Sequence, residues 1–143
     1  MRTFATLITL TMILLLHSSV SSVSAVDDWP IWRGPNRNNI APGNQTPPTK
    51  WDEDTNVVWK TEVPGRGHAS PVMVGNKIFL ATAEDDKQIQ SVVCFAKDSG
   101  EKLWQTTINE GNFPKRIHPN NTHASQTIPV CYTHLTLPTN REV

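Results

Sequence analysis

The side chains best suited to binding in this sequence are two histidines that belong to a repeated tripeptide. His-Ala-Ser occurs at His68 and again at His123, 55 residues later. Two imidazoles at equivalent places in successive repeats could bind a metal ion or an anion. The competing interpretation is that both histidines are hydrogen-bonded inside the fold for structural reasons. We therefore treat His68 and His123 as candidate ligand-face residues.

A second group of candidate residues lies in the insertion that precedes the second tripeptide, residues 111–122. Arg116 and His118 are in this insertion, and loops are where ligands commonly meet a rigid scaffold. The alternative is a solvated loop that Phe113 and Ile117 hold down against the fold. Arg116 and His118 join the candidate ligand-face residues.

The remaining reactive side chains do not assemble into a catalytic set. Asp85 and Asp86 are adjacent, but they fall in a polar turn, where solvated carboxylates are the ordinary finding. Cys94 lies inside an apolar strand pattern, which predicts a buried thiol. A disulfide to Cys131 is conceivable in an oxidising compartment but is not indicated. We predict no catalytic, cofactor-binding or metal-ligating residue in this chain.

The elements that carry these residues are four short runs of strand-forming residues separated by turns. Gly75-Asn76 has the composition of a two-residue hairpin turn. The runs are rich in Val, Ile, Phe and Thr, and no helical period competes with them. The predicted strands cover residues 68–74, 77–83, 91–96 and 101–108. The sequence therefore predicts an all-β fold with a four-stranded antiparallel meander.

The last turn and strand carry a recognisable motif. Residues 94–104 read C-F-A-K-D-S-G-E-K-L-W, which resembles the tryptophan-docking motif A-x-D-x-x-T-G-x-x-x-W of the PQQ-like (quinoprotein, BamB-like) β-propeller repeat. Asp98, Ser99 and Gly100 supply the turn, with Ser99-Gly100 in place of Thr-Gly, and Trp104 supplies the indole. Ala96 stands where the family usually has Asp. The resemblance implies that Trp104 is buried between neighbouring blades.

The same resemblance implies an architecture for the longer chain. The segments W-P-I-W-R-G-P-N and P-G-R-G-H-A-S-P-V also look like secreted members of the family. One complete blade would cover about residues 64–108, and the next would start at residues 123–131, within a repeat region of residues 57–131. Trp59 precedes Trp104 by 45 residues, a blade period, and residues 57–63 are predicted to be a strand. Since the family often has about eight blades, we expect an N-terminal fragment whose C-terminal blades are missing.

The two ends of the chain have distinct patterns. Arg2, an apolar run of roughly ten residues and small residues before position 26 are typical of a cleaved secretory signal. We predict a signal peptide at residues 1–25, export to the periplasm or the cell exterior, and no transmembrane span. Residues 26–56 are rich in Pro and Trp and predict an extended arm. Residues 132–143 break the repeat pattern and resemble a translated adapter read-through, so we treat them as a non-native tail.

The charge balance argues against nucleic acid as a partner. The chain has 13 Lys and Arg residues against 13 Asp and Glu residues. No basic stripe, aromatic-interleaved patch or phosphate-binding glycine loop occurs. We expect protein partners at a propeller face.

The resemblance leaves functions of different kinds open, because propellers host unrelated activities. The first is a non-enzymatic, BamB-like binding scaffold for envelope protein assembly or another protein–protein interaction. The alternative is a fragment of a PQQ-dependent alcohol or sugar dehydrogenase, which would bind pyrroloquinoline quinone and calcium. This chain has no adjacent pair of cysteines of the kind that many such enzymes carry. A third possibility is a surface module that binds polysaccharide through Trp29, Trp32 and Trp51.

Overall fold

The computed structural model describes residues 28–41, 43, 45–131 and 134–135. The predicted signal peptide lies outside these residues. The predicted tail also lies outside them, apart from His134 and Leu135.

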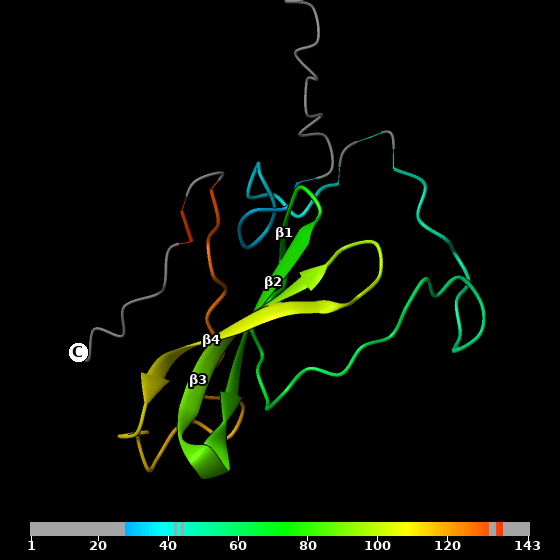
Figure 1. Cartoon of the computed structure of the whole chain (residues 1–143). Helices are drawn as coiled ribbons and strands as arrows, with labels where there is room; N and C mark the ends of the chain where they lie inside the picture. Colours follow the sequence, from blue (N-terminus) through cyan, green and yellow to red (C-terminus); the bar gives the residue numbers. More distant parts are fainter. Residues whose placement is uncertain (1–27, 42, 44, 132–133, 136–143) are drawn as a thin grey trace, which may run out of the picture.

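The described chain is built around one four-stranded antiparallel sheet (Figure 1). Its strands follow in sequence order, each paired with the next: β1 (Val72–Val74), β2 (Lys77–Glu84), β3 (Ile89–Ala96) and β4 (Lys102–Glu110). No α-helix occurs among the described residues. The predicted all-β meander is therefore confirmed, although the first strand is shorter than residues 68–74 and the last one extends to Glu110.

The turns between the strands form where the sequence supplies residues that tolerate positive φ. Gly75 has φ of 56° between β1 and β2, and Gly100 has φ of 70° before β4. The β2–β3 connection is a single 3₁₀ turn, Asp85–Lys87, which ends at Gln88 in the left-handed conformation. Glycine adopts such angles without steric cost, so the meander follows from local chemistry.

One face of the sheet, which we call the core face, packs against the C-terminal part of the described chain. Because side chains alternate along a strand, Phe79 and Ala81 of β2 lie on the same face as Val92 and Cys94 of β3. This face forms one buried cluster with Ala124, Ile128 and Val130, and Val72 of β1 also belongs to it. Each of these residues is less than 9% exposed.

The opposite face, which we call the arm face, is covered by the chain that leads into β1. Val93 and Phe95 are buried there. The Thr82 hydroxyl, on the same face, donates a hydrogen bond to the Pro64 carbonyl. Trp59, Val63 and Thr61 face Ile78 and Leu80 across an apolar groove. The sheet is thus covered on both faces by segments from its own chain.

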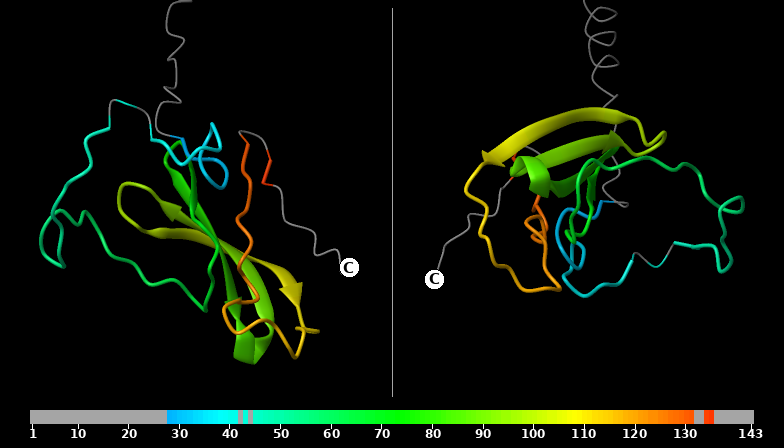
Figure 2. Two further views of the ribbon diagram at one scale, coloured as in Figure 1. Left: turned by 180° about the vertical axis from the view of Figure 1, so that it is seen from behind. Right: turned by 90° about the horizontal axis from the view of Figure 1, so that it is seen from below.

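The arm is only partly as predicted. Trp29 exchanges two backbone hydrogen bonds with Met73, at 2.8 and 2.9 Å, and its ring packs on Gly34. Residues 31–39 form turns rather than an extended chain. Trp32 and Trp51 are 64% and 71% exposed, so Trp29 alone of the three tryptophans anchors the arm. Beyond the turns, residues 45–66 swing away from the sheet before returning to it (Figure 2).

Residues 57–63 do not form the predicted strand. Val58 is 87% exposed, and no neighbouring strand supplies backbone partners for the segment among the described residues. Trp59, however, is fixed. Its indole nitrogen donates a 2.8 Å hydrogen bond to the Lys97 carbonyl, and its ring lies against the Cα of Gly100.

The prediction that Trp104 is buried is wrong for the described chain. Trp104 is 38% exposed, and its ring contacts Phe79 at a centroid distance of 5.9 Å. The physical reason is its place on β4, an edge strand with no further strand beside it in the described chain. The indole that fills the Asp98-Ser99-Gly100 turn is Trp59 instead.

The second repeat does not begin with a strand. Residues 123–131 cross the core face in irregular conformation. Within the described residues, their one β-bridge joins Val130 to Leu135. The Val130 amide also donates a 2.9 Å hydrogen bond to the Pro30 carbonyl. We expected both His68 and His123 to lie at the start of a strand. Neither of them does. The segment serves instead as a cover for the core.

Candidate functional site

The two His-Ala-Ser tripeptides lie side by side. The backbone amides of His68 and Ala69 both donate to the Ala124 carbonyl, each at 3.1 Å. A side chain at Gly67 would meet that same carbonyl at 3.0 Å, so glycine permits this close approach. The repeated sequence thus marks a real contact. It is made by the backbone, since the exposed His68 side chain has no hydrogen bond to His123.

His123 is the best-connected of the candidate site residues. Its Nδ1 atom lies 2.9 Å from Asp85 Oδ1, and its Nε2 atom lies 3.3 Å from the Pro114 carbonyl oxygen. Its ring also packs against Phe113 at a centroid distance of 4.3 Å. The side chain is 14% exposed. His123 therefore ties the insertion to the β2–β3 turn, and both ring nitrogens face oxygen acceptors.

The backbone around His123 is fixed by side-chain hydrogen bonds. The Gln90 amide donates to the His123 carbonyl. The Thr122 amide donates to Ser125 Oγ at 2.9 Å, and the two hydroxyls are 3.0 Å apart. Thr122 Oγ1 in turn accepts the Ala124 amide at 3.3 Å. Hydroxyl side chains that bond nearby backbone groups stabilise turns of this kind.

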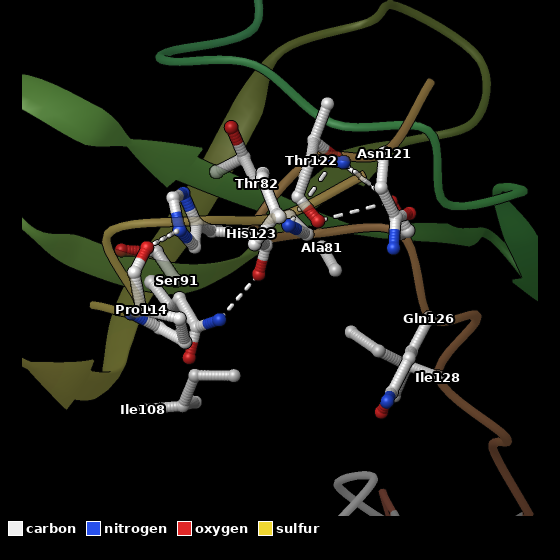
Figure 3. A pocket seen from close by; sticks show the side chains of 14 residues that line it. Ala81, Thr82, Ser91, Ile108, Pro114, Asn121, Thr122, His123, Gln126 and Ile128 are labelled. Carbon is white, nitrogen blue, oxygen red and sulfur yellow. Dashed lines mark hydrogen bonds between the residues drawn. The ribbon is translucent and has the colours of Figure 1, made fainter. Parts of the chain in front are cut away.

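These residues form one wall of a cleft of about 200 Å³ between the sheet and the insertion (Figure 3). Its lining is neutral and mixed, with hydroxyl and amide groups set among aliphatic side chains. The polar lining comes from Thr82, Gln90, Ser91, Asn121, Thr122, His123, Ser125 and Gln126. Among the described residues, no carboxylate, lysine or arginine lines the cleft. Since the nitrogens of His123 point to Asp85 and Pro114, the imidazole is not placed to act as a base toward the cleft.

Arg116 and His118 lie in the insertion but do not line the cleft. Both are exposed. His118 Nδ1 accepts a 3.2 Å hydrogen bond from the Asn120 amide, and its carbonyl accepts the Asn121 amide at 2.8 Å. Arg116 makes no hydrogen bond or ion pair within the described residues. The structure therefore does not bring the four candidate residues together at one point.

The prediction that Phe113 and Ile117 hold the insertion down is correct in part. Phe113 packs against the core cluster and against His123. Ile117 lines the cleft but remains 38% exposed. The insertion is anchored through Phe113, and its outer side, with Arg116 and His118, faces solvent.

Sequence reasoning missed Asp85, which was assigned to an ordinary solvated turn. Its carboxylate is the partner of His123, 38 residues away along the chain. No local pattern signals this contact. Among the described residues, no group of three His, Cys, Asp or Glu side chains is placed to hold a metal ion.

Neither cysteine forms a disulfide within the described residues, and the two differ in environment. Cys94 is buried and Cys131 is exposed. Burial raises the pKa of the Cys94 thiol, while the positive charge of Lys77 opposes this shift. Cys131 Sγ lies 3.7 Å from His134 Nδ1. The buried thiol at Cys94 confirms the sequence prediction.

No family model, curated protein or solved structure was found to match this chain. In the part of the chain that the structure describes, no helix has the length and apolar character needed to cross a membrane.

Proposed function

We propose that this chain belongs to an exported, BamB-like β-propeller scaffold that holds a protein partner and carries out no chemical step. The chain would supply the first repeats of a longer propeller. About eight blades in all would match the propeller family that the sequence resembles.

The observation that carries this proposal is the contact between Trp59 and the turn before β4. Trp59 precedes the motif tryptophan, Trp104, by 45 residues, and its indole sits on Gly100 with a hydrogen bond to Lys97. A tryptophan from one repeat that fills the turn of the next is a means of joining consecutive units. Repeat proteins depend on such contacts, because each unit buries its surface against its neighbours.

The insertion provides a surface suited to a protein partner. It is fixed from beneath by Phe113 and by the Asp85–His123–Pro114 contacts, while Lys115, Arg116 and His118 are exposed on its outer side. Arginine on a rigid loop is a frequent anchor residue in protein interfaces. The neutral cleft beside it offers no charged group for chemistry.

The test is affinity capture with the exported protein as bait. Substitution of Arg116 by Glu should remove a specific envelope partner, because it reverses the exposed charge without touching the buried contacts. Lys60→Glu is the matched control, since Lys60 is an exposed lysine in the segment that leads into β1 and its ion pair is with exposed Glu53. Retention of the same partner by Arg116→Glu, or equal loss with Lys60→Glu, would contradict the proposal.

A further inference from the structure

The strand β4 presents an open edge nine residues long. Its inner edge pairs with β3, and no strand or backbone hydrogen bond occupies its outer edge within the described residues. The edge strand is plainly visible in Figure 2. Leu103 and Trp104 are 45% and 38% exposed on it. An exposed strand with unpaired N–H and C=O groups is a template for pairing with another strand.

The two ends of β4 carry opposite charges. Lys102 and Glu110 are exposed, and neither side chain makes an ion pair or hydrogen bond within the described residues. Lys102 pairs with Phe95 and Glu110 pairs with Ile89 in the β3–β4 ladder. Because residues 89 and 95 lie on the same face of β3, Lys102 and Glu110 both lie on the arm face.

We propose that β4 pairs antiparallel with β4 of a second copy of this chain, about a two-fold axis through Thr106. This register places each Lys102 opposite Glu110 of the second copy, so the symmetry forms two ion pairs. Trp104 and Thr106 pair with Cys94 and Val92 and so lie on the core face. Leu103 and Ile108 have no partner in the β3–β4 ladder, and these two extra residues are the reason that Lys102 and Glu110 lie on the other face. Ile108 packs against the core cluster, and the register places Trp104 opposite Ile108 and Thr106 opposite itself. Opposite charges, aromatic with β-branched residues, and paired threonines are all favourable across antiparallel strands. The two sheets would join into one continuous sheet.

The sequence disfavours the neighbouring register. A shift of one residue that brings Glu101 opposite Glu110 would place like charges together and would separate Lys102 from Glu110. The irregularities in the β3–β4 ladder lie between Gln90 and Ser91 and between Cys94 and Phe95. The centre of β4, from Trp104 to Thr107, pairs regularly and is free of them. A two-fold symmetric contact of this kind closes on itself as a dimer.

The experiment measures the mass of the purified whole chain by sedimentation across a concentration series. The expected species is a dimer. Lys102→Glu should weaken dimerisation about tenfold or more, because both ion pairs become repulsive. Glu110→Lys should do the same. The double variant, Lys102→Glu with Glu110→Lys, should restore the dimer, since the charges are exchanged and not lost.

Two controls separate pairing at this edge from other effects. Lys50→Glu makes the same charge change at an exposed lysine of the arm and should leave the dimer intact. Circular dichroism of each variant shows whether the sheet is retained. A further variant, Thr106→Lys, should disrupt the dimer independently, because it places two lysines opposite each other at the two-fold axis. A monomeric parent chain would overturn the proposal. So would a dimer that is indifferent to the single charge reversals, or a double variant that remains monomeric.

Discussion

His123 shows how one side chain can position a whole loop. The imidazole contacts Asp85 on the β2–β3 turn, the Pro114 carbonyl and the Phe113 ring. These contacts join the turn, the insertion and the cover of the core face. The sequence identified His123 through its repeated tripeptide, but the pattern could not identify Asp85, because its partner lies far away in the chain. The role of His123 in the described chain is therefore to hold the insertion in place.

Cys94 allows a direct test of burial at the residue level. We predict that an aromatic disulfide reagent reacts at once with the exposed Cys131 and reaches Cys94 only when the protein unfolds, because Cys94 is 0% exposed. In a Cys131→Ser variant the fast reaction should disappear. Equal rates for both thiols in native buffer would contradict the packing of β3.

The raised pKa of Cys94 adds a pH dependence to that prediction. Its ordinary value is 9.0, and burial raises the value in the folded chain. Above pH 9.0 the unfolded thiol ionises while the folded thiol keeps its proton, so the unfolded state gains stability. The contribution of Cys94 to folding is therefore fully present below pH 9.0 and declines as the pH rises above it. Urea melts of the parent chain and of Cys94→Ser, each at pH 7 and pH 10, measure this contribution to the free energy of unfolding.

At the level of elements, the contact that matters most is between Trp59 and the turn before β4. Gly100 has φ of 70°, and a Cβ there would lie 2.4 Å from the Trp59 ring. We predict that Gly100→Ala destabilises the fold by about 3 kcal/mol, from both the unfavourable φ and the displaced indole. Urea denaturation followed by circular dichroism gives the value.

Gly111 is the matched control for this substitution. It has a similar φ of 75°, but no atom lies within 4 Å of the position a Cβ would take. Gly111→Ala should therefore lower the free energy of unfolding by only about 1 kcal/mol, because only the positive φ is unfavourable for alanine there. In a Trp59→Ala background, the destabilisation caused by Gly100→Ala should fall to a similar value. The two residues are in contact, so their effects on stability are not additive. Equal losses of stability from Gly100→Ala and Gly111→Ala in the parent chain would contradict the contact between Trp59 and Gly100.

The same turn shows what could be predicted from the sequence. Turn residues and strand periodicity are local, so the strands from residue 77 to residue 110 were predicted nearly to their ends. Which indole fills the turn depends on contacts between distant segments, and so the motif wrongly indicated a buried Trp104. Residues 57–63 have a strand pattern but find no pairing partner in the described chain. The cleft escaped prediction for the same reason, because its walls come from the sheet, residues 121–128 and the insertion.

For the whole molecule, the structure describes a single sheet that its own chain covers on both faces. Ala124, Ile128 and Val130 close the core face, and residues 59–66 close the arm face. Several large apolar side chains nevertheless remain exposed, among them Trp32, Trp51 and Val58. We interpret this as the surface of a unit that is completed by further repeats or by a second copy.

The choice between scaffold and quinoprotein is decided most directly by titrating pyrroloquinoline quinone, with calcium, into the longer protein that we expect this chain to begin. Binding is followed by calorimetry and by the absorbance of the quinone, and dye-linked alcohol oxidation is measured on the same sample. The scaffold account predicts no saturable binding and no turnover. Stoichiometric binding of the quinone together with alcohol oxidation would contradict it.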